Sequence, residues 1–197
     1  MRVGVLGGTF DPIHQGHLLL ARAAQKQFSL DKVLFIPALI PPHKTHKRDM
    51  APAPYRYRMV ELALKGQNAF EISHEEFDRP EVSYTVDTLK ALHQKYPGSQ
   101  FYLIVGADAI SEIQSWKDPE EIRKLAVIAA AKRPGYSMPR REAVNFEPIE
   151  MQESELSSSE IREKLSHGEL LGAEFLPEEV ESYVRKMNLY SREWERL

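Results

Sequence analysis

Short apolar runs rich in β-branched and aromatic residues recur along the chain, each bounded by polar or glycine-containing segments. Uninterrupted runs of this length are typical of strands that are buried on both faces. Between most of them lie longer stretches whose apolar residues recur every three or four positions, as in an amphipathic helix. The predicted strands cover residues 3–6, 32–37, 70–73, 101–105 and 126–131, and the predicted helices cover 18–28, 55–64, 86–96 and 119–125.

The order of these elements predicts the fold class. Strands alternate with helices from the start of the chain, which predicts an α/β protein with a doubly wound parallel sheet covered by helices on both faces. In such a sheet, ligands bind beyond the carboxyl ends of the strands. Residues that directly follow a predicted strand are therefore the first candidates for a functional site.

Three segments between these elements are predicted as loops of more than structural interest. Residues Ala38–Tyr55 contain four prolines among basic residues and are longer than a turn requires, which suggests a mobile lid. Residues His74–Leu89 lead into a helix, and "GADAISEIQSW" (Gly106–Trp116) follows the central predicted strand.

The pattern changes after about Lys132, where a polar, proline-bearing segment precedes two further predicted helices, within 154–169 and 176–189. Ser157 or Ser158 is suited to cap the first, and Pro177 is suited to the first turn of the second. We expect a single domain over residues 1–197, with a core over 1–150 and a small C-terminal helical part over 151–197 packed on it.

Composition narrows the classes of partner. The chain has 197 residues, of which 42% are hydrophobic, and a net charge of −3 with interspersed acidic and basic residues. This length and hydrophobic content suffice for a real core, and no basic patch for nucleic acid is evident. The chain has no cysteine, which excludes disulfides and thiol catalysis. We find neither a secretory leader nor a membrane-spanning stretch, so we expect a cytoplasmic protein without a membrane partner.

The sharpest chemical signal is the segment "GGTFDPIHQGH" after the first predicted strand. Gly7 and Gly8 remove side chains where the chain turns toward a helix, so that backbone N–H groups can face an anion. His14 and His17 lie one helical turn apart and share a face, where imidazole N–H groups can donate to phosphate oxygens, and Gly16 between them leaves room for a ligand. The competing interpretation is two ordinary polar residues at a helix start. A zinc pair is less favoured because no third ligand lies nearby.

The combination of strand, double glycine, Asp-Pro and H-x-G-H resembles the signature of the nucleotidyltransferase superfamily, whose fold is a Rossmann-like sheet. The resemblance covers nearly the whole chain. The order and spacing of further segments are similar to those of the bacterial nicotinate-nucleotide adenylyltransferase family: "PPHK" (Pro41–Lys44), "SYTVDTL" (Ser83–Leu89), "GADAISEIQSW", "AKRPGY" (Ala131–Tyr136) and "SSSEIR" (Ser157–Arg162).

That resemblance implies an activity. The family transfers the AMP part of ATP to nicotinate mononucleotide, which gives nicotinate adenine dinucleotide and pyrophosphate on the route to NAD. ATP is then the co-substrate, with Mg²⁺ held mainly by its phosphates and by water. The phosphate of the mononucleotide is already largely ionised, since the second pKa of a phosphomonoester is about 6. No general base is therefore required, and the residues must align two anions and stabilise developing charge.

The resemblance also implies roles for particular residues. It implies that His14, His17 and Arg162 act in catalysis. It implies that ATP is bound by Gly7, Gly8, Thr9, Phe10, Gly106, Asp108, Arg133, Ser158 and Ser159. For the nicotinate nucleotide it implies His43, Lys44, Tyr84, Thr85 and Trp116. An aromatic face suits a cationic pyridinium ring, and backbone donors suit its carboxylate. No metal ligand is assigned.

Most of these residues also have a purely structural interpretation. The serine cluster with Arg162 can be a capping stretch, and Trp116 can be a core anchor. Lys44 can be a solvated loop lysine, Asp108 a helix cap, and Arg133 part of a turn before a proline. These alternatives stay open at the level of sequence.

The chain departs from the family pattern at Ser159, where threonine is usual, and at Glu81, where glycine is common just before "SYT". The second departure bears on selectivity for the carboxylate. Three other functions remain: phosphopantetheine adenylyltransferase, a cytidylyltransferase, or a catalytically silent nucleotide-binding module. His14 and "SYTVDTL" argue against the first, and "SSxxIR" argues against the second. The sequence does not report the oligomeric state, and a homodimer is left open.

Overall fold

The computed structural model describes residues 1–42, 50–79, 81–132, 134–135, 139, 144–152 and 154–191. Its strands are β1 (Arg2–Gly8), β2 (Lys32–Pro37), β3 (Phe70–Ile72), β4 (Gln100–Gly106), β5 (Val127–Ala131) and β6 (Glu147–Ile149). Its helices are α1 (Gln15–Phe28), α2 (Ala53–Ala63), α3 (Thr85–Lys95), α4 (Ala107–Glu112), α5 (Pro119–Leu125), α6 (Ser158–Ser166) and α7 (Glu178–Lys186), with a 3₁₀ turn η1 (Ile113–Ser115) after α4.

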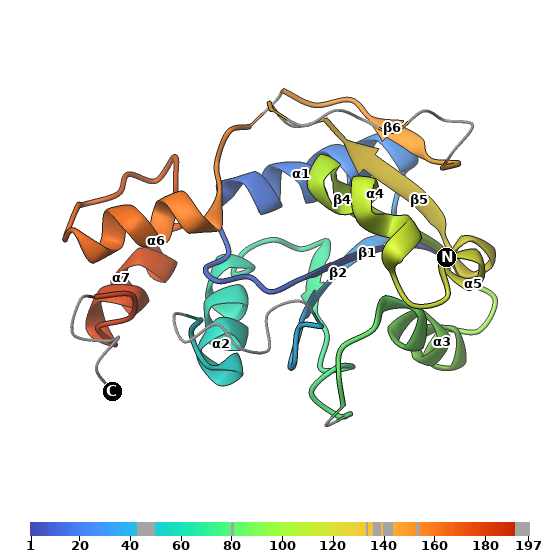
Figure 1. Cartoon of the computed structure of the whole chain (residues 1–197), viewed down its shortest axis with the longest axis horizontal. Coiled ribbons are helices and arrows are strands. Elements are labelled where there is room, and N and C mark those ends of the chain that lie inside the picture. The colour runs from blue at the N-terminus through green and yellow to red at the C-terminus, as the bar shows by residue number, and fades with distance from the viewer. Residues whose placement is uncertain are drawn as a thin grey trace.

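The six strands form one parallel sheet in the order β3-β2-β1-β4-β5-β6 (Figure 1). The order reverses between β1 and β4, where Val5 lies opposite Leu103. In open α/β sheets, ligands bind at such a switch point, beyond the carboxyl ends of the strands. The predicted doubly wound parallel sheet is confirmed, and its topology directs attention to the segments that follow β1 and β4.

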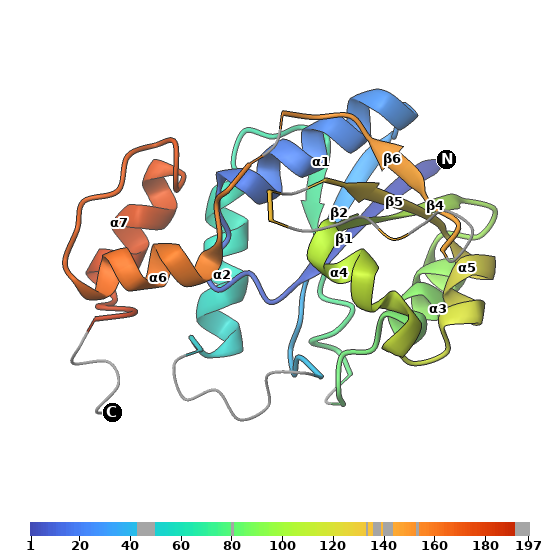
Figure 2. The same cartoon turned by 45° about the horizontal axis from the view of Figure 1, so that its top comes forward.

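Helices cover both faces of the sheet (Figures 1 and 2). Because side chains alternate along a strand, neighbouring strand residues enter opposite layers. One layer joins Leu6 and Phe35 with residues of α1, α2, α6 and α7, and the other joins Val5 and Leu34 with residues of α3, α4 and α5. The sheet is thus packed between two apolar layers, and the loops that follow its strands lie at the carboxyl-end edge of the sheet.

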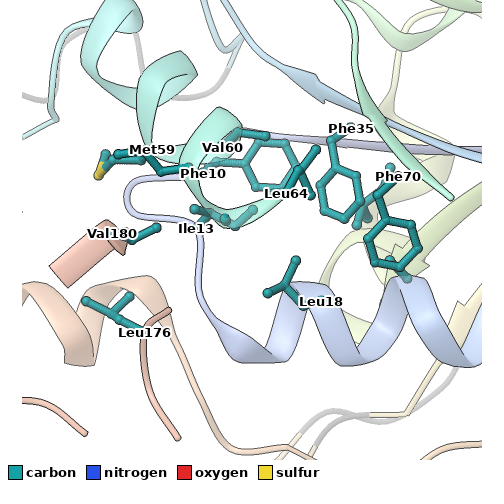
Figure 3. Packing of buried hydrophobic residues seen from close by; sticks show 14 of the residues in the cluster. Phe10, Ile13, Leu18, Phe35, Met59, Val60, Leu64, Phe70, Leu176 and Val180 are labelled. Carbon is teal, nitrogen blue, oxygen red and sulfur yellow. The ribbon is translucent and has the colours of Figure 1, made fainter. Parts of the chain in front are cut away.

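The last two helices share the first of these layers. Leu176 and Val180 belong to the same buried cluster as Phe10, Ile13 and Met59. Figure 3 shows Phe10 and Ile13, from the segment between β1 and α1, lying between α2 and the labelled residues Leu176 and Val180. The side chains of the signature segment therefore bind the C-terminal helices to the sheet.

Two sequence predictions are corrected. Residues 106–116, predicted as a loop, form α4 and η1, because Gly106 supplies an extended N-cap and Ala107 and Ile110 are buried one turn apart. The polar stretch before the tail contains the unpredicted strand β6, which has only three residues including Pro148. Proline is tolerated at a sheet edge, where one N–H need not be paired.

The predictions for the tail hold with small shifts. Ser157, one of the two predicted caps, accepts a hydrogen bond from the backbone N–H of Glu160 and caps α6. Pro177 precedes the first helical residue of α7 and occupies its N-cap position. Within the described ranges, no helix combines the length and apolar character needed to cross a membrane.

Candidate active site

The segment from the end of β1 to the start of α1 forms the centre of the candidate site. Phe10 adopts a left-handed conformation (φ 48°), and the peptide bond from Asp11 to Pro12 is cis. The ring of Phe10 is buried beneath Gly8, where a Cβ would lie 3.2 Å from its Cζ. Phe10 is thus a core residue that can offer only its backbone to a ligand, while Gly7 is exposed.

His14 and His17 come together as the spacing predicts. His14 is the N-cap of α1 and is buried, and the ring centroids of the two histidines lie 3.8 Å apart. The ring of His17 also contacts Phe10 edge-on at 5.0 Å. The pair therefore has a fixed geometry at the positive end of the helix dipole.

The protonation of His17 follows from its hydrogen bond. Its Nδ1 accepts the backbone N–H of His14 at 3.2 Å. An imidazole nitrogen that accepts must carry a lone pair, so the proton of neutral His17 lies on Nε2. The cap thus sets the tautomer that presents an N–H donor at Nε2. This is the donor that a phosphate oxygen requires.

Gly16 has a different role from the one that its position suggests. The sequence indicated that this glycine leaves room for a ligand, but the space over it is filled by His14. A Cβ at Gly16 would lie 3.0 Å from Cε1 and Nδ1 of His14. Gly16 therefore lets the buried imidazole lie flat on the first turn of α1, and any side chain there would displace it.

The first turn of α6 is fastened to the β1–α1 segment. Ser158 Oγ donates to the carbonyl oxygen of Pro12 at 3.0 Å, and Arg162 Nη1 donates to the carbonyl oxygen of Asp11 at 2.7 Å. Arg162 Nη2 donates to Ser159 Oγ at 3.3 Å. Three predicted site residues that are far from the signature in sequence are thus placed directly beside it.

Some amide groups at the start of α1 donate hydrogen bonds to the segment between α6 and α7. The backbone N–H of Gln15 donates to the carbonyl oxygen of Phe175 at 3.0 Å, and its side-chain amide donates to that of Ala173 at 2.8 Å. The N–H of His17 donates to the carbonyl oxygen of His14. The C-terminal part of the chain therefore occupies the backbone and side-chain amides of Gln15 at the start of α1.

Sequence analysis missed Arg56, which is completely buried beneath the site. Its guanidinium donates to three carbonyl oxygens, those of Thr9 at 2.6 Å, Leu39 at 3.3 Å and Ala51 at 2.9 Å. Burial lowers the pKa of Arg56, but an arginine remains charged in a protein. Arg56 joins the segments after β1 and β2 to the start of α2. Its position on the apolar face of a predicted helix was the available signal.

Asp11 is a second residue whose contacts were not expected. Its Oδ1 accepts the backbone N–H of Ala51 at 3.0 Å and the hydroxyl of Tyr190 at 2.7 Å, and its Oδ2 lies 3.6 Å from Arg162 Nη1. Burial and the neighbouring Asp11 raise the pKa of Tyr190 well above its usual value, so the phenol stays protonated and donates. Nothing in the sequence marked Tyr190.

The residues expected for the pyridine nucleotide lie around the start of α3. Tyr84 is its N-cap and Thr85 its first residue. Trp116 follows η1 and packs partly against the second apolar layer. Lys117 connects the two segments, since its Nζ lies 4.8 Å from the centre of the Tyr84 ring and donates to Asp87 at 2.9 Å. The structure therefore brings Lys117, the neighbour of Trp116, to the first turn of α3.

The buried carboxyl group of Glu76 is bonded to the helix that carries the residues expected for the pyridine nucleotide. Glu76 Oε1 accepts the hydroxyl of Thr88 at 2.7 Å, and burial raises the pKa of Glu76, against hydrogen bonds from Ser83 and Thr88 that lower it. Ser83 Oγ in turn accepts the backbone N–H groups of Leu39 and Ile40, at 3.1 and 3.4 Å. The segment that precedes Tyr84 is thus joined to the end of β2.

Gly106 and Asp108 lie at the carboxyl end of β4, across the switch point from β1. Gly106 is the N-cap of α4, and Asp108 is exposed in its first turn. A Cβ on Gly106 would meet Asp108 Oδ1 at 2.7 Å, so a side chain there would have to move the carboxylate of Asp108. Asp108 therefore occupies a helix-start position, compatible with either of its two interpretations.

Three predicted contacts, His43, Lys44 and Arg133, lie outside the described residues. Among those described, no three His, Asp or Glu side chains gather as a metal ligand set.

Comparison with known proteins identifies the class first. A family model described as cytidylyltransferase-like matches residues 5–164. This range includes the sheet except for the first three residues of β1, the β1–α1 segment and the beginning of α6 with Arg162. The fold and the glycine-histidine segment are therefore those of the nucleotidyltransferases.

Full-length relatives narrow this class. A protein of Thermus thermophilus named "Probable nicotinate-nucleotide adenylyltransferase" is 43% identical, with 96% of this chain and 100% of that protein aligned. A protein of the same name from Desulfitobacterium hafniense is 40% identical over 96% of this chain and 95% of its own. The chain belongs to the nicotinate-nucleotide adenylyltransferase family.

A solved structure agrees in fold. Plasmodium falciparum nicotinic acid mononucleotide adenylyltransferase, complexed with NaAD, superposes with a TM-score of 0.79 at 20% identity, covering 96% of this chain and 97% of that one. At this identity the likeness concerns the fold alone.

Proposed function

We propose that this protein transfers the adenylyl group of ATP to nicotinate mononucleotide, releasing pyrophosphate and forming nicotinate adenine dinucleotide for NAD synthesis. The family supports the reaction. The observation that carries the site is the hydrogen bond from the backbone of His14 to His17 Nδ1, because it fixes the tautomer of His17 that carries its proton on Nε2, beside the switch point.

The reaction needs alignment more than proton transfer. An oxygen of the mononucleotide's phosphate attacks the α-phosphorus of ATP, a new P–O bond forms, and the bond to the bridging oxygen breaks, so that pyrophosphate leaves with that oxygen's electron pair. His17 Nε2–H donates to an α-phosphate oxygen, with His14 stacked on it at 3.8 Å. A positioned donor of this kind stabilises the charge that develops in the transition state.

The leaving pyrophosphate is assigned to the start of α6. The hydroxyls of Ser158 and Ser159 and the guanidinium of Arg162 are held there by contacts to the β1–α1 segment. Arg162 has five N–H donors, and two of them are used in the bonds to Asp11 and Ser159. The others can bind the β- and γ-phosphates. Mg²⁺ enters with ATP as the substrate complex.

The pyridine ring is assigned to Trp116 and its carboxylate to Tyr84 and Thr85. The backbone N–H groups in the first turn of α3 lie at the positive end of its dipole, which attracts a carboxylate. The connection through Lys117 adds a positive charge beside the Tyr84 ring. His43, Lys44, Gly106, Asp108 and Arg133 keep their proposed substrate contacts. A homodimer and a cytoplasmic location stay predictions from sequence.

An acceptor screen tests the proposal. Purified protein is incubated with Mg²⁺ and ATP together with nicotinate mononucleotide, nicotinamide mononucleotide or phosphopantetheine, and released pyrophosphate is measured. A parallel series replaces ATP with CTP. We expect nicotinate mononucleotide with ATP to give by far the fastest release. Lys26→Ala, an exposed change in the last turn of α1, is the control and should retain this rate.

Two results would contradict the proposal. Pyrophosphate release only with phosphopantetheine as the acceptor, or only with CTP in place of ATP, would assign another reaction of the superfamily. Nucleotide binding without any release would identify a silent module.

A further inference from the structure

Beneath the signature segment, a carboxylate connects three distant parts of the chain. Asp11 Oδ1 accepts from the amide of Ala51 and from the hydroxyl of Tyr190, while Oδ2 lies 3.6 Å from Arg162. Asp11 and Tyr190 are both only 5% exposed. A buried carboxylate must be satisfied by donors, and Tyr190 supplies the shorter of the two hydrogen bonds to Oδ1.

Arg162 is hydrogen-bonded to the backbone of Asp11, whereas its contact with the Asp11 carboxylate is a longer ion pair. The Nη1 atom lies 2.7 Å from the carbonyl oxygen, a hydrogen bond, but 3.6 Å from Oδ2, which is beyond one. A guanidinium beside an ionised carboxylate would ordinarily form a bidentate pair. Here the carboxylate is already satisfied at Oδ1, so the guanidinium keeps N–H donors for another anion.

We propose that Tyr190 is a positioning residue for ATP: its hydroxyl satisfies Asp11 and thereby keeps Arg162 from closing its 3.6 Å ion pair with that carboxylate into a hydrogen-bonded one, so that the guanidinium stays available to the leaving phosphates. This inference rests on the proposed function and adds to it a residue outside the signature and outside the match to the family model. Tyr190 acts through Asp11 and Arg162 and does not touch substrate.

Tyr190→Phe isolates the hydroxyl, because it retains the buried ring. We expect KM for ATP to rise about tenfold, the effect of a hydrogen bond to a charged group, while KM for nicotinate mononucleotide changes less than about twofold. A merely structural role would move both constants together or neither. Tyr183→Phe, on α7 with its ring near Tyr55, removes a hydroxyl from the same part of the chain and should leave both KM values unchanged.

A double-mutant cycle with Arg162→Ala gives the decisive measurement. If Tyr190 acts through Arg162, then Tyr190→Phe has almost no further effect on ATP binding once the guanidinium is gone. An equal effect in both backgrounds, or an unchanged KM for ATP in folded Tyr190→Phe, would overturn the inference.

Two additions keep the result clear. Asp11→Asn provides a second route if Tyr190→Phe melts early, since it removes the charge that competes for Arg162 but keeps an acceptor oxygen; the affinity for ATP should then stay the same or rise, and a marked loss in the folded variant would also overturn the inference. Calorimetry with a non-hydrolysable ATP analogue gives the same cycle without turnover. Lack of pyrophosphate release by the wild-type protein would therefore contradict the proposed function and leave this inference to be decided by binding.

Discussion

The two sides of the candidate site are built differently. On the phosphate side, side chains from distant elements donate to backbone carbonyl oxygens: Ser158 to Pro12, Arg162 to Asp11, and the buried Arg56 to Thr9. On the pyridine side, the connection between the two segments is made by Lys117, whose ion pair with Asp87 is 45% exposed at the lysine and 34% at the aspartate.

This difference bears on what each side can do. Bonds to backbone atoms hold these side chains in defined positions, as charge stabilisation in a transition state requires. Exposed ion pairs contribute little rigidity and allow side chains to adjust to a substrate. We therefore expect loss of the His17 donor on the phosphate side to lower kcat, and changes on the pyridine side to raise KM for nicotinate mononucleotide.

The largest effect should come from His17→Ala. It removes both the Nε2–H donor and the acceptor of the His14 amide. We expect kcat to fall at least about 10²-fold, as when a preorganised transition-state donor is lost. Steady-state pyrophosphate release, compared with Lys26→Ala at the far end of the same helix, provides the measurement. Full activity would remove His17 from the mechanism and erase the contrast between the two sides.

A smaller effect is expected for Trp116→Ala on the pyridine side. Loss of an aromatic face for a cationic ring should raise KM for nicotinate mononucleotide about fivefold and leave KM for ATP unchanged. Trp116→Phe retains a ring and should recover most of the affinity. Saturation curves for each substrate, with the other held in excess, separate the two constants. An equal loss with both substrates would show that Trp116 is only a core anchor.

The smallest expected effect is on thermal stability, and it comes from replacing Glu76, the buried carboxyl group on the pyridine side. Burial raises the pKa of Glu76, so the folded protein binds its proton more tightly than the unfolded chain. The ionised carboxylate then costs stability, and this cost appears as the pH rises through the interval between the unfolded and folded pKa values. Glu76→Gln is neutral at every pH. The difference between its Tm and that of the wild type should therefore rise, by a few degrees at most, when the pH is raised from about 4 to about 8.

Melting curves at the two pH values check this prediction. Glu112→Gln, an exposed carboxylate at the end of α4, is the matched control and should show the same Tm difference at both. A difference for Glu76→Gln that does not change with pH would contradict the assigned cause.

Much of the fold could be predicted because its strands are buried on both faces. The segments that form β1, β2, β4 and β5 are continuous apolar runs. In a protein of this size, such short runs have few stable conformations other than a strand buried on both faces. The strand β6 escaped because two of its three residues are exposed and one is proline. Short elements carry too few apolar positions to establish a period.

For the site, sequence could place residues that share one local segment, such as His14 and His17. It could not find contacts that exist only after folding. Arg56 and Tyr190 belong to no recognisable sequence motif, and their importance follows from their burial and from their hydrogen-bond partners. Ser158 and Arg162 were named through family resemblance, and the structure shows how they reach Pro12 and Asp11.

The hydrogen bond between Asp11 and Tyr190 also bears on the order in which the molecule assembles. It closes a span of 179 positions, far longer than any β-to-β crossover in the sheet. Long loops lose entropy on closure before their contacts repay it, so this junction is expected to form after the local crossovers. A partly folded chain can therefore possess the sheet and both histidines and still lack a finished nucleotide site.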